Sequence, residues 1–262
     1  MNTFTRFLTA LTVLFGLLFS TIAIIGCGSD NIKQVADPET QFKRAMELYE
    51  KGKYYKAETE FQMFIYNYPG NTSVDSAQYL LAMCYYKDRD YAIGAGEFKK
   101  FLTSFPTSPF ADDSQYRLAL CHYHQSPHYA LDQMDTYIAI DEFYTFLDDY
   151  PKSELEDSVS MYLNEMRNKL AKKSFRTAKM YQGFNLFDPA ILYYNKILKE
   201  YSDSQFSSEA LFRRSECHFK LDKPLEARED LLEYIDRYKG EKYYNKATKR
   251  LREIEDNTRT EK

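Results

Sequence analysis

The chain has 262 residues, 44% of them hydrophobic and 28% charged, which is enough for one or two ordinary domains. Its formal net charge of −4 is mild, so composition does not indicate a nucleic-acid-binding protein. Aromatic residues are abundant, with 24 Tyr, 19 Phe and no Trp, and most of them recur at the fixed positions described below.

The first 27 residues read as a targeting segment and not as part of the fold. Arg6 precedes an apolar run, Phe7–Ile25, that contains no charged residue and is followed by Gly26 and Cys27. This order resembles a bacterial lipoprotein signal, which implies cleavage after residue 26 and lipidation of Cys27. The residue directly after Cys27 is Gly28, whereas an Asp at this position commonly retains a lipoprotein in the inner membrane. The resemblance therefore implies the outer membrane. An uncleaved transmembrane anchor is the alternative.

Residues 27–38 have no periodicity and are interpreted as the lipidated N-terminus and a polar tether. A first helix is predicted from Glu39, because apolar residues then recur at three- and four-residue steps. Gly52 marks its end, as glycine often does just past a helix.

A repeat begins with this helix. Each unit closes with an aromatic residue followed by Pro or a polar turn residue, and the intervals between units are 37, 45, 51 and 37 residues. These closing pairs are Tyr68–Pro69, Phe105–Pro106, Tyr150–Pro151, Tyr201–Ser202 and Tyr238–Lys239. The period is therefore about 37 residues, with two insertions.

Within each unit, a small residue and two large residues stand twelve, eight and four positions before the second member of the closing pair. The small residues are Ala57, Gly94, Ala139, Ala190 and Ala227, and the large ones eight before are Phe61, Phe98, Phe143, Tyr194 and Leu231. Four-residue steps place them on one face of a helix, with the small residue where a neighbouring helix comes close. The pattern resembles the tetratricopeptide repeat (TPR), so the expected fold is an all-α solenoid of five helix pairs.

The insertions make the resemblance more specific. The third unit contains an Asp132–Gln133 segment, followed by Thr136 and Phe143. The fourth is predicted to start with one helix of about 28 residues, Leu155–Gln182, which has no Gly or Pro and contains the basic stretch 167–173. A last helix, Tyr243–Glu255, would cap the solenoid. Together with the lipoprotein signal, this order is similar to BamD, the family of outer-membrane assembly lipoproteins.

The resemblance implies a non-catalytic subunit of the machinery that folds and inserts β-barrel proteins, anchored to the outer membrane on its periplasmic face. The N-terminal repeats would meet unfolded barrel clients, and the long helix with the C-terminal repeats would hold a POTRA domain of a BamA-type barrel protein. Other assembly lipoproteins are also implied partners. Arg167 and Lys169 match the family's basic positions ahead of Leu–Ala; Lys cannot form the bidentate fork of Arg. A solvated helix face is the alternative for both.

The expected organisation is a signal peptide over 1–26, the lipidated tether over 27–38, three repeats over 39–154, and the long helix, two repeats and cap over 155–256. No cofactor is expected, and no metal site. Cys121, His122, His124 and His128 are close in sequence, yet Cys121 occupies a repeat position together with Cys84 and Cys217, so all three are predicted to be buried free thiols.

Two other functions stay open at this point. One is a periplasmic TPR lipoprotein adaptor in envelope maintenance or cell division, and the other is an enzyme or carrier on a repeat scaffold, against which stands the lack of a catalytic motif. Four adjacent tyrosine pairs predict surface rings for partner binding, because neighbouring side chains lie about 100° apart on a helix. The pairs are Tyr54–Tyr55, Tyr85–Tyr86, Tyr193–Tyr194 and Tyr243–Tyr244.

Overall fold

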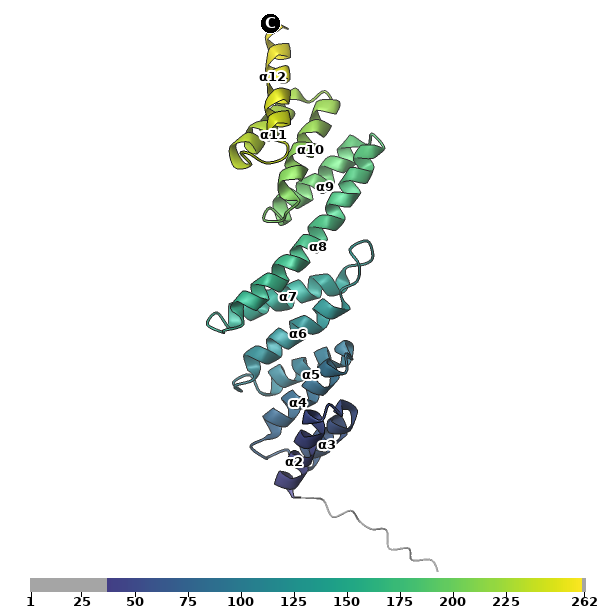
Figure 1. Ribbon diagram of the computed structural model, residues 1–262, viewed down its shortest axis with the longest axis vertical. Coiled ribbons are helices and arrows are strands. Elements are labelled where there is room, and N and C mark those ends of the chain that lie inside the picture. The colour runs from purple at the N-terminus through teal and green to yellow at the C-terminus, as the bar shows by residue number, and fades with distance from the viewer. Residues whose placement is uncertain (1–36, 261–262) are drawn as a thin grey trace, which may run out of the picture. The chain divides into compact units, whose positions relative to one another are not determined.

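The computed structural model describes residues 37–260 (Figure 1). The predicted signal peptide, Cys27 and most of the tether lie outside the described residues. Phe42 and the residues after it belong to one compact unit, and the described residues before it, Asp37–Gln41, begin the first helix. There the Asp37 carboxylate accepts the Thr40 N–H at 3.0 Å and caps the helix start.

Eleven α-helices and no strand are present in the described part of the chain. They are α2 (Pro38–Glu50), α3 (Tyr54–Asn67), α4 (Val74–Lys87), α5 (Tyr91–Ser104), α6 (Ala111–Gln125), α7 (Met134–Asp149), α8 (Glu156–Gly183), α9 (Phe187–Glu200), α10 (Ser207–Lys220), α11 (Pro224–Arg237) and α12 (Tyr244–Thr260). Each helix from α4 to α11 packs against the ones before and after it, and Phe42 of α2 contacts Phe61 and Phe64 of α3 (Figure 1). The fold is a TPR-type α-solenoid of five helix pairs, closed by α12.

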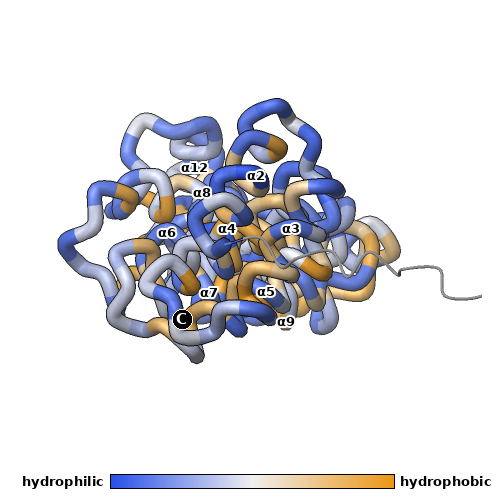
Figure 2. Tube along the Cα trace, turned by 90° about the horizontal axis from the view of Figure 1, so that it is seen from below, coloured by the Kyte–Doolittle hydropathy of each residue, from blue (hydrophilic) through white to orange (hydrophobic). Residues whose placement is uncertain are grey.

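The repeat positions form the core. Every large residue eight before a closing pair is fully buried, and so are the alanines at the small-residue position. Gly94 takes the place of alanine in α5: a Cβ there would lie 3.5 Å from the Cys121 sulfur and 3.5 Å from the Tyr86 nitrogen, which is ordinary van der Waals contact. Seen from below in Figure 2, the turns at the rim are mostly hydrophilic.

The turn between the two helices of a pair has a recurring geometry. Gly52, Arg89, Asn185 and Asp222 all have a left-handed backbone, with φ between 58° and 68°, and each stands seventeen residues before the second member of its closing pair. This conformation ends a helix and suits glycine best. In the third repeat the equivalent position is Met134, which is the first residue of α7, because the inserted loop fills residues 126–133 between α6 and α7.

Helix α8 is the 28-residue helix that the sequence predicts, displaced by one residue at each end. Its first half contributes Val159, Leu163 and Met166 to a core cluster with α6 and α7. Its second half contributes Phe175 and Ala178 to a cluster with α9 and α10. One helix about 42 Å long therefore belongs to two repeats at once.

Helix α12 covers the last pair, as expected for a capping helix. Ala247 and Ile254 pack with Phe212, Leu231 and Tyr234 in one cluster of α10, α11 and α12. Among the described residues, no helix has the length and apolar character needed to cross a bilayer.

Candidate partner-binding surfaces

Arg167 lies on α8 and joins three segments of the fold. Its guanidinium donates to both carboxylate oxygens of Asp203, at 2.6 and 3.1 Å, and to the Glu200 carbonyl at 3.0 Å. It also donates to the Tyr144 hydroxyl of α7 at 3.0 Å and lies over the Tyr201 ring. The hydrogen bond from Arg167 lowers the pKa of Asp203. The Arg167 side chain is therefore partly buried, and its guanidinium already has hydrogen-bond partners within the chain.

Lys169 is also engaged within the protein. Its ammonium group donates to the Ser126 hydroxyl at 2.8 Å and to the Ser126 carbonyl at 3.3 Å, so it ties α8 to the end of α6. Burial lowers the pKa of this lysine. The structure places the two predicted residues two positions apart on α8, each with partners in other segments, and their contact with another protein stays a prediction.

The basic stretch named from the sequence ends at Lys173, and on α8 it extends into a longer row of cations. Lys172, Lys173, Arg176 and Lys179 continue from Lys169 at three- and four-residue steps, which place them along one side of the helix. Lys172 lies 4.6 Å from the centre of the Tyr129 ring, and Lys173 donates to the Leu131 carbonyl at 2.6 Å, whereas Arg176 is exposed. We call these five residues the basic row. Their spacing alone could have revealed them.

A groove of about 280 Å³ lies beside the basic row, between the start of α7, α8 and α9. Met134, Tyr137 and Leu170 supply apolar surface to it, Lys173 and Lys196 supply positive charge, and Asp132 supplies one negative charge. Met134 is 65% exposed, which is unusual for so large an apolar side chain. The groove therefore combines exposed apolar surface with positive charge.

The Asp132–Gln133 segment shapes one wall of this groove. The Gln133 side chain is buried and donates to the carbonyls of His128, Leu131 and Asp132, at 3.0 to 3.1 Å. Its carbonyl oxygen accepts the Thr136 hydroxyl at 2.9 Å. A single amide thus holds the inserted loop against the start of α7, which gives the segment a structural role.

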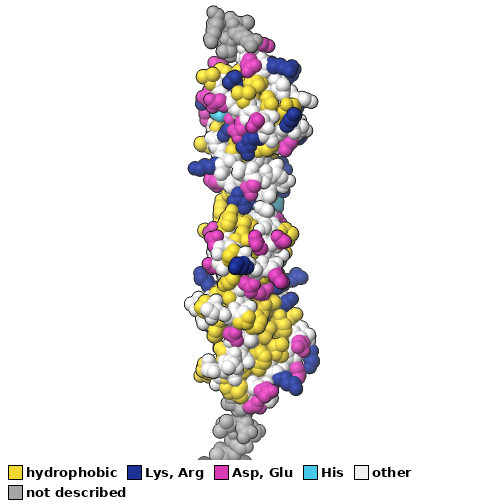
Figure 3. All heavy atoms as spheres, turned by 90° about the vertical axis from the view of Figure 1, so that its left-hand side faces the viewer, with side chains coloured by type: hydrophobic (Ala, Val, Ile, Leu, Met, Phe, Trp, Pro, Cys, Tyr) yellow, Lys and Arg dark blue, Asp and Glu magenta, His cyan; other side chains and the backbone are white. Residues whose placement is uncertain are grey.

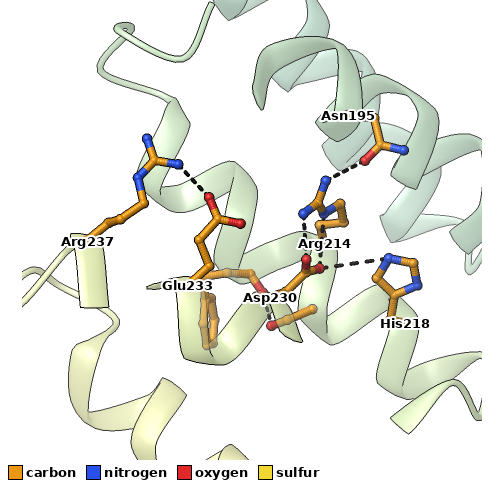
Figure 4. Close-up of polar contacts among 8 residues, drawn as sticks. Asn195, Arg214, His218, Asp230, Glu233 and Arg237 are labelled. Carbon is orange, nitrogen blue, oxygen red and sulfur yellow. Dashed lines mark hydrogen bonds and ion pairs between the residues drawn. The ribbon is translucent and has the colours of Figure 1, made fainter. Parts of the chain in front are cut away.

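A second polar cluster lies between α10 and α11 (Figure 4). Arg214 donates through two nitrogens to the carboxylate of Asp230, which is only 5% exposed, and through a third to Asn195. Burial raises the pKa of Asp230 and lowers the pKa of the nearby His218. The cluster fastens the last repeat to α9, and its groups face one another and not a cavity.

Cys84, Cys121 and Cys217 are buried free thiols, as predicted from their shared position in the repeat. Burial raises the pKa of Cys84, Cys121 and Cys217 to about 12. In the segments that the structure describes, no group of His, Cys, Asp and Glu side chains could hold a metal ion. His124 instead stacks on Tyr91, with ring centres 4.6 Å apart.

The tyrosine pairs contribute less surface than expected. Tyr55 is 74% exposed, but both rings of the other three pairs are at least partly buried. Tyr86 shows the reason, since it packs against Tyr91 of α5 and His124 of α6. Helix α4 is covered by its own partner and by the next repeat, so both rings of its pair are covered. On α9 the Tyr193 ring stacks on Tyr181 of α8.

Apolar surface is nevertheless present over the N-terminal repeats. On the face drawn in Figure 3, hydrophobic side chains gather over the lower part, with Lys, Arg, Asp and Glu around them. The large apolar side chains exposed on the second helices of the first three pairs are Tyr55, Met63, Tyr66, Ile93, Met134, Tyr137 and Tyr144.

Stacked helix pairs with mixed apolar and charged surfaces define a helical scaffold of the TPR class. A family model described as "YfiO: Outer membrane lipoprotein" matches residues 35–231. The chain belongs to the YfiO family, the BamD-type TPR lipoproteins, and the resemblance drawn from the sequence is confirmed.

One solved structure with a similar fold is the complex of the TPR2AB domain of yeast Sti1 with pHSP90. It is 11% identical to this chain, with a TM-score of 0.44, and the match covers 84% of each chain. A thermophilic TPR protein of Thermus thermophilus is 14% identical, with a TM-score of 0.35, and the match covers 83% of this chain and 98% of that one. No curated protein matches the chain.

Proposed function

We propose that this protein is a lipid-anchored subunit of the β-barrel assembly machinery, located at the periplasmic face of the outer membrane. The family match over residues 35–231 carries the proposal. The predicted lipidation of Cys27 would supply the anchor, since several acyl chains hold a protein stably at a bilayer. The N-terminal repeats are the proposed site for unfolded barrel clients, where Ile93 of α5 supplies exposed apolar surface.

The basic row and the groove beside it are the proposed contact for a POTRA domain of a BamA-type barrel protein. Arg167 and Lys169 begin this region, but each already has partners in its own chain. The exposed Arg176 is better placed for an ion pair with an acidic partner surface. Positive charge next to exposed Met134 and Tyr137 fits a partner with an acidic rim and an apolar centre.

The test is a pull-down of the tagged, membrane-extracted protein in mild detergent. The unmodified chain should recover a POTRA-containing barrel protein, and Lys172→Glu/Arg176→Glu should weaken that recovery by about tenfold, which corresponds to about 1.4 kcal/mol for two reversed rim charges. The matched control is Lys99→Glu/Lys100→Glu on α5, which reverses two exposed charges elsewhere and should have no effect.

If both variants recover as much of the barrel protein as the unmodified chain does, the assembly function stands and the basic row is not the contact. If the unmodified chain recovers no such barrel protein, the assembly function itself is wrong. A periplasmic adaptor outside the machinery would then be the better interpretation.

A further inference from the structure

The outward side of α3 differs from the outward side of every other second helix. It consists of Tyr55, Thr59, Gln62, Met63 and Tyr66, which we call the α3 face. These residues lie opposite the buried Ala57, Phe61 and Phe64. Tyr55 is 74% exposed and Tyr66 is 86% exposed, so two large aromatic rings project into solvent from one helix.

The repeat register allows a direct comparison with the other repeats. The five equivalent positions include Lys99 and Lys100 in α5, Asp141 and Asp148 in α7, three charges in α9 and three in α11. The α3 face carries none. In the other four repeats this side carries two or three charged residues, although α7 also presents Tyr137 and Tyr144 there; the first repeat presents tyrosine and methionine with no charge.

The acidic side chains that border the α3 face are engaged within the protein. Glu58 accepts the Tyr85 hydroxyl at 2.8 Å, and Glu60 pairs with Arg44 at 2.9 Å. Lys53 and Lys56, at the start of the helix, are exposed. The α3 face therefore carries no charge, and its tyrosine rings end in polar hydroxyl groups. The exposed Lys53 and Lys56 border it at one end.

The position of this repeat in the chain indicates what covers the face. Ten residues lie between Cys27 and Pro38, and this stretch can span at most about 40 Å. A lipid anchor on Cys27 would hold the first repeat within that distance of the bilayer, whereas each later repeat begins farther along the chain. Tyrosine is enriched where membranes meet water, and lysines are attracted to anionic lipid headgroups.

We propose that the α3 face docks on the phospholipid surface of the membrane to which the protein is anchored. The proposal rests on the lipid anchor that the proposed function includes. The acyl chains supply most of the affinity, and the α3 face fixes the orientation of the first repeat against the bilayer. Tyr55, Met63 and Tyr66 would lie at the headgroup level, with Lys53 and Lys56 near anionic headgroups.

The test measures the depth of one labelled position in vesicles. The lipidated full chain carrying Thr59→Cys, labelled with an environment-sensitive fluorophore, is reconstituted in phosphatidylethanolamine–phosphatidylglycerol vesicles that contain nitroxide lipids. Thr59 is at the centre of the face and its replacement keeps both tyrosines. The matched control is Gly96→Cys at the equivalent position of α5, where a Cβ meets nothing within 4 Å.

We expect the label at position 59 to be quenched several-fold more than the label at position 96, and Tyr55→Ser/Tyr66→Ser to remove the difference. Equal quenching at the two positions, while the protein floats with the vesicles, would overturn membrane docking and leave the anchor intact. Protection of position 59 only after a POTRA-containing protein or an unfolded barrel client is added would also overturn it, in favour of a protein contact. Failure of the native chain to float would instead reject the anchor.

Discussion

Arg167 shows how one side chain can couple segments that lie far apart in the sequence. Its fork reaches Asp203, 36 residues later, and its third contact reaches Tyr144, 23 residues earlier. Its side chain is only 20% exposed, while that of Asp203 is 49% exposed. Water therefore partly screens the ion pair. Its contribution to the free energy of unfolding is that of a bidentate surface pair and not that of a buried pair.

Replacement of this side chain should therefore destabilise the fold moderately. We expect Arg167→Ala to lower the free energy of unfolding by about 1–2 kcal/mol, because four hydrogen bonds from a charged group and a ring contact are lost. Urea denaturation measures the change. Arg176→Ala, which removes an exposed guanidinium nine residues later on the same helix, should change the same quantity by less than about 0.5 kcal/mol. Equal losses would show that the Asp203 pair contributes nothing.

The same pair predicts a pH dependence. Asp203 has a lowered pKa in the folded protein because of the hydrogen bond from Arg167. A carboxyl group with a depressed folded pKa contributes stability that is present above its unfolded pKa, about 3.9, and is lost as the pH falls through the folded value. The stability difference between the unmodified chain and Arg167→Ala should therefore be constant from pH 7 to about pH 5 and shrink at lower pH. A difference that persists unchanged at pH 2 would contradict this assignment.

At the scale of the helix pair, the left-handed turn is a point of stored strain. Glycine adopts this backbone freely, but only the first repeat has glycine there, and Arg89, Asn185 and Asp222 occupy it at φ of 58° to 68°. We expect Arg89→Gly to stabilise the protein by about 0.5–1 kcal/mol, measured as a higher midpoint of thermal unfolding.

A neighbouring position gives the matched control for this substitution. Asp88 has a helical φ of −78°, so Asp88→Gly gains nothing from the absence of a Cβ and increases only the freedom of the unfolded chain. It should lower the midpoint. If both glycine variants lower it, the turn is not strained in the way that its backbone angle indicates.

Sequence periodicity predicted the helices well because each core position is read from a local spacing. The small residue and the first large residue lie one turn apart and are buried in every repeat. The second predicted large residue is only partly buried, and the side chain just before it is fully buried instead: Phe64, Phe101, Phe146, Ile197 and Tyr234. The pairing of Arg167 with Asp203 could not be predicted in this way, since it depends on the turn after α9 reaching back to α8. Tyr86 was misjudged for a similar reason, because its cover comes from the next repeat. The lipidation site and the partner contacts stay predictions.

At the scale of the whole solenoid, each repeat is stabilised by its neighbours, so the end of the stack depends on its cap. We expect a chain truncated after Glu241, which lacks α12, to expose Phe212, Leu231 and Tyr234. Hydrogen exchange should then accelerate in α10 and α11, while α4 and α5 keep their protection. Acceleration throughout the solenoid would show that it unfolds as a single cooperative unit.

Helix α8 has a mechanical consequence that follows from its length and from its membership in two core clusters. A rigid rod about 42 Å long that tilts by about 10° at one end moves its other end by about 7 Å. Small adjustments of the first half of α8 against α6 and α7 would thus be amplified at α9 and α10. A client that binds the N-terminal repeats and tilts α8 would then shift the surface that holds a partner on the C-terminal repeats. The shift would pass along one rigid helix, without a loop to transmit it.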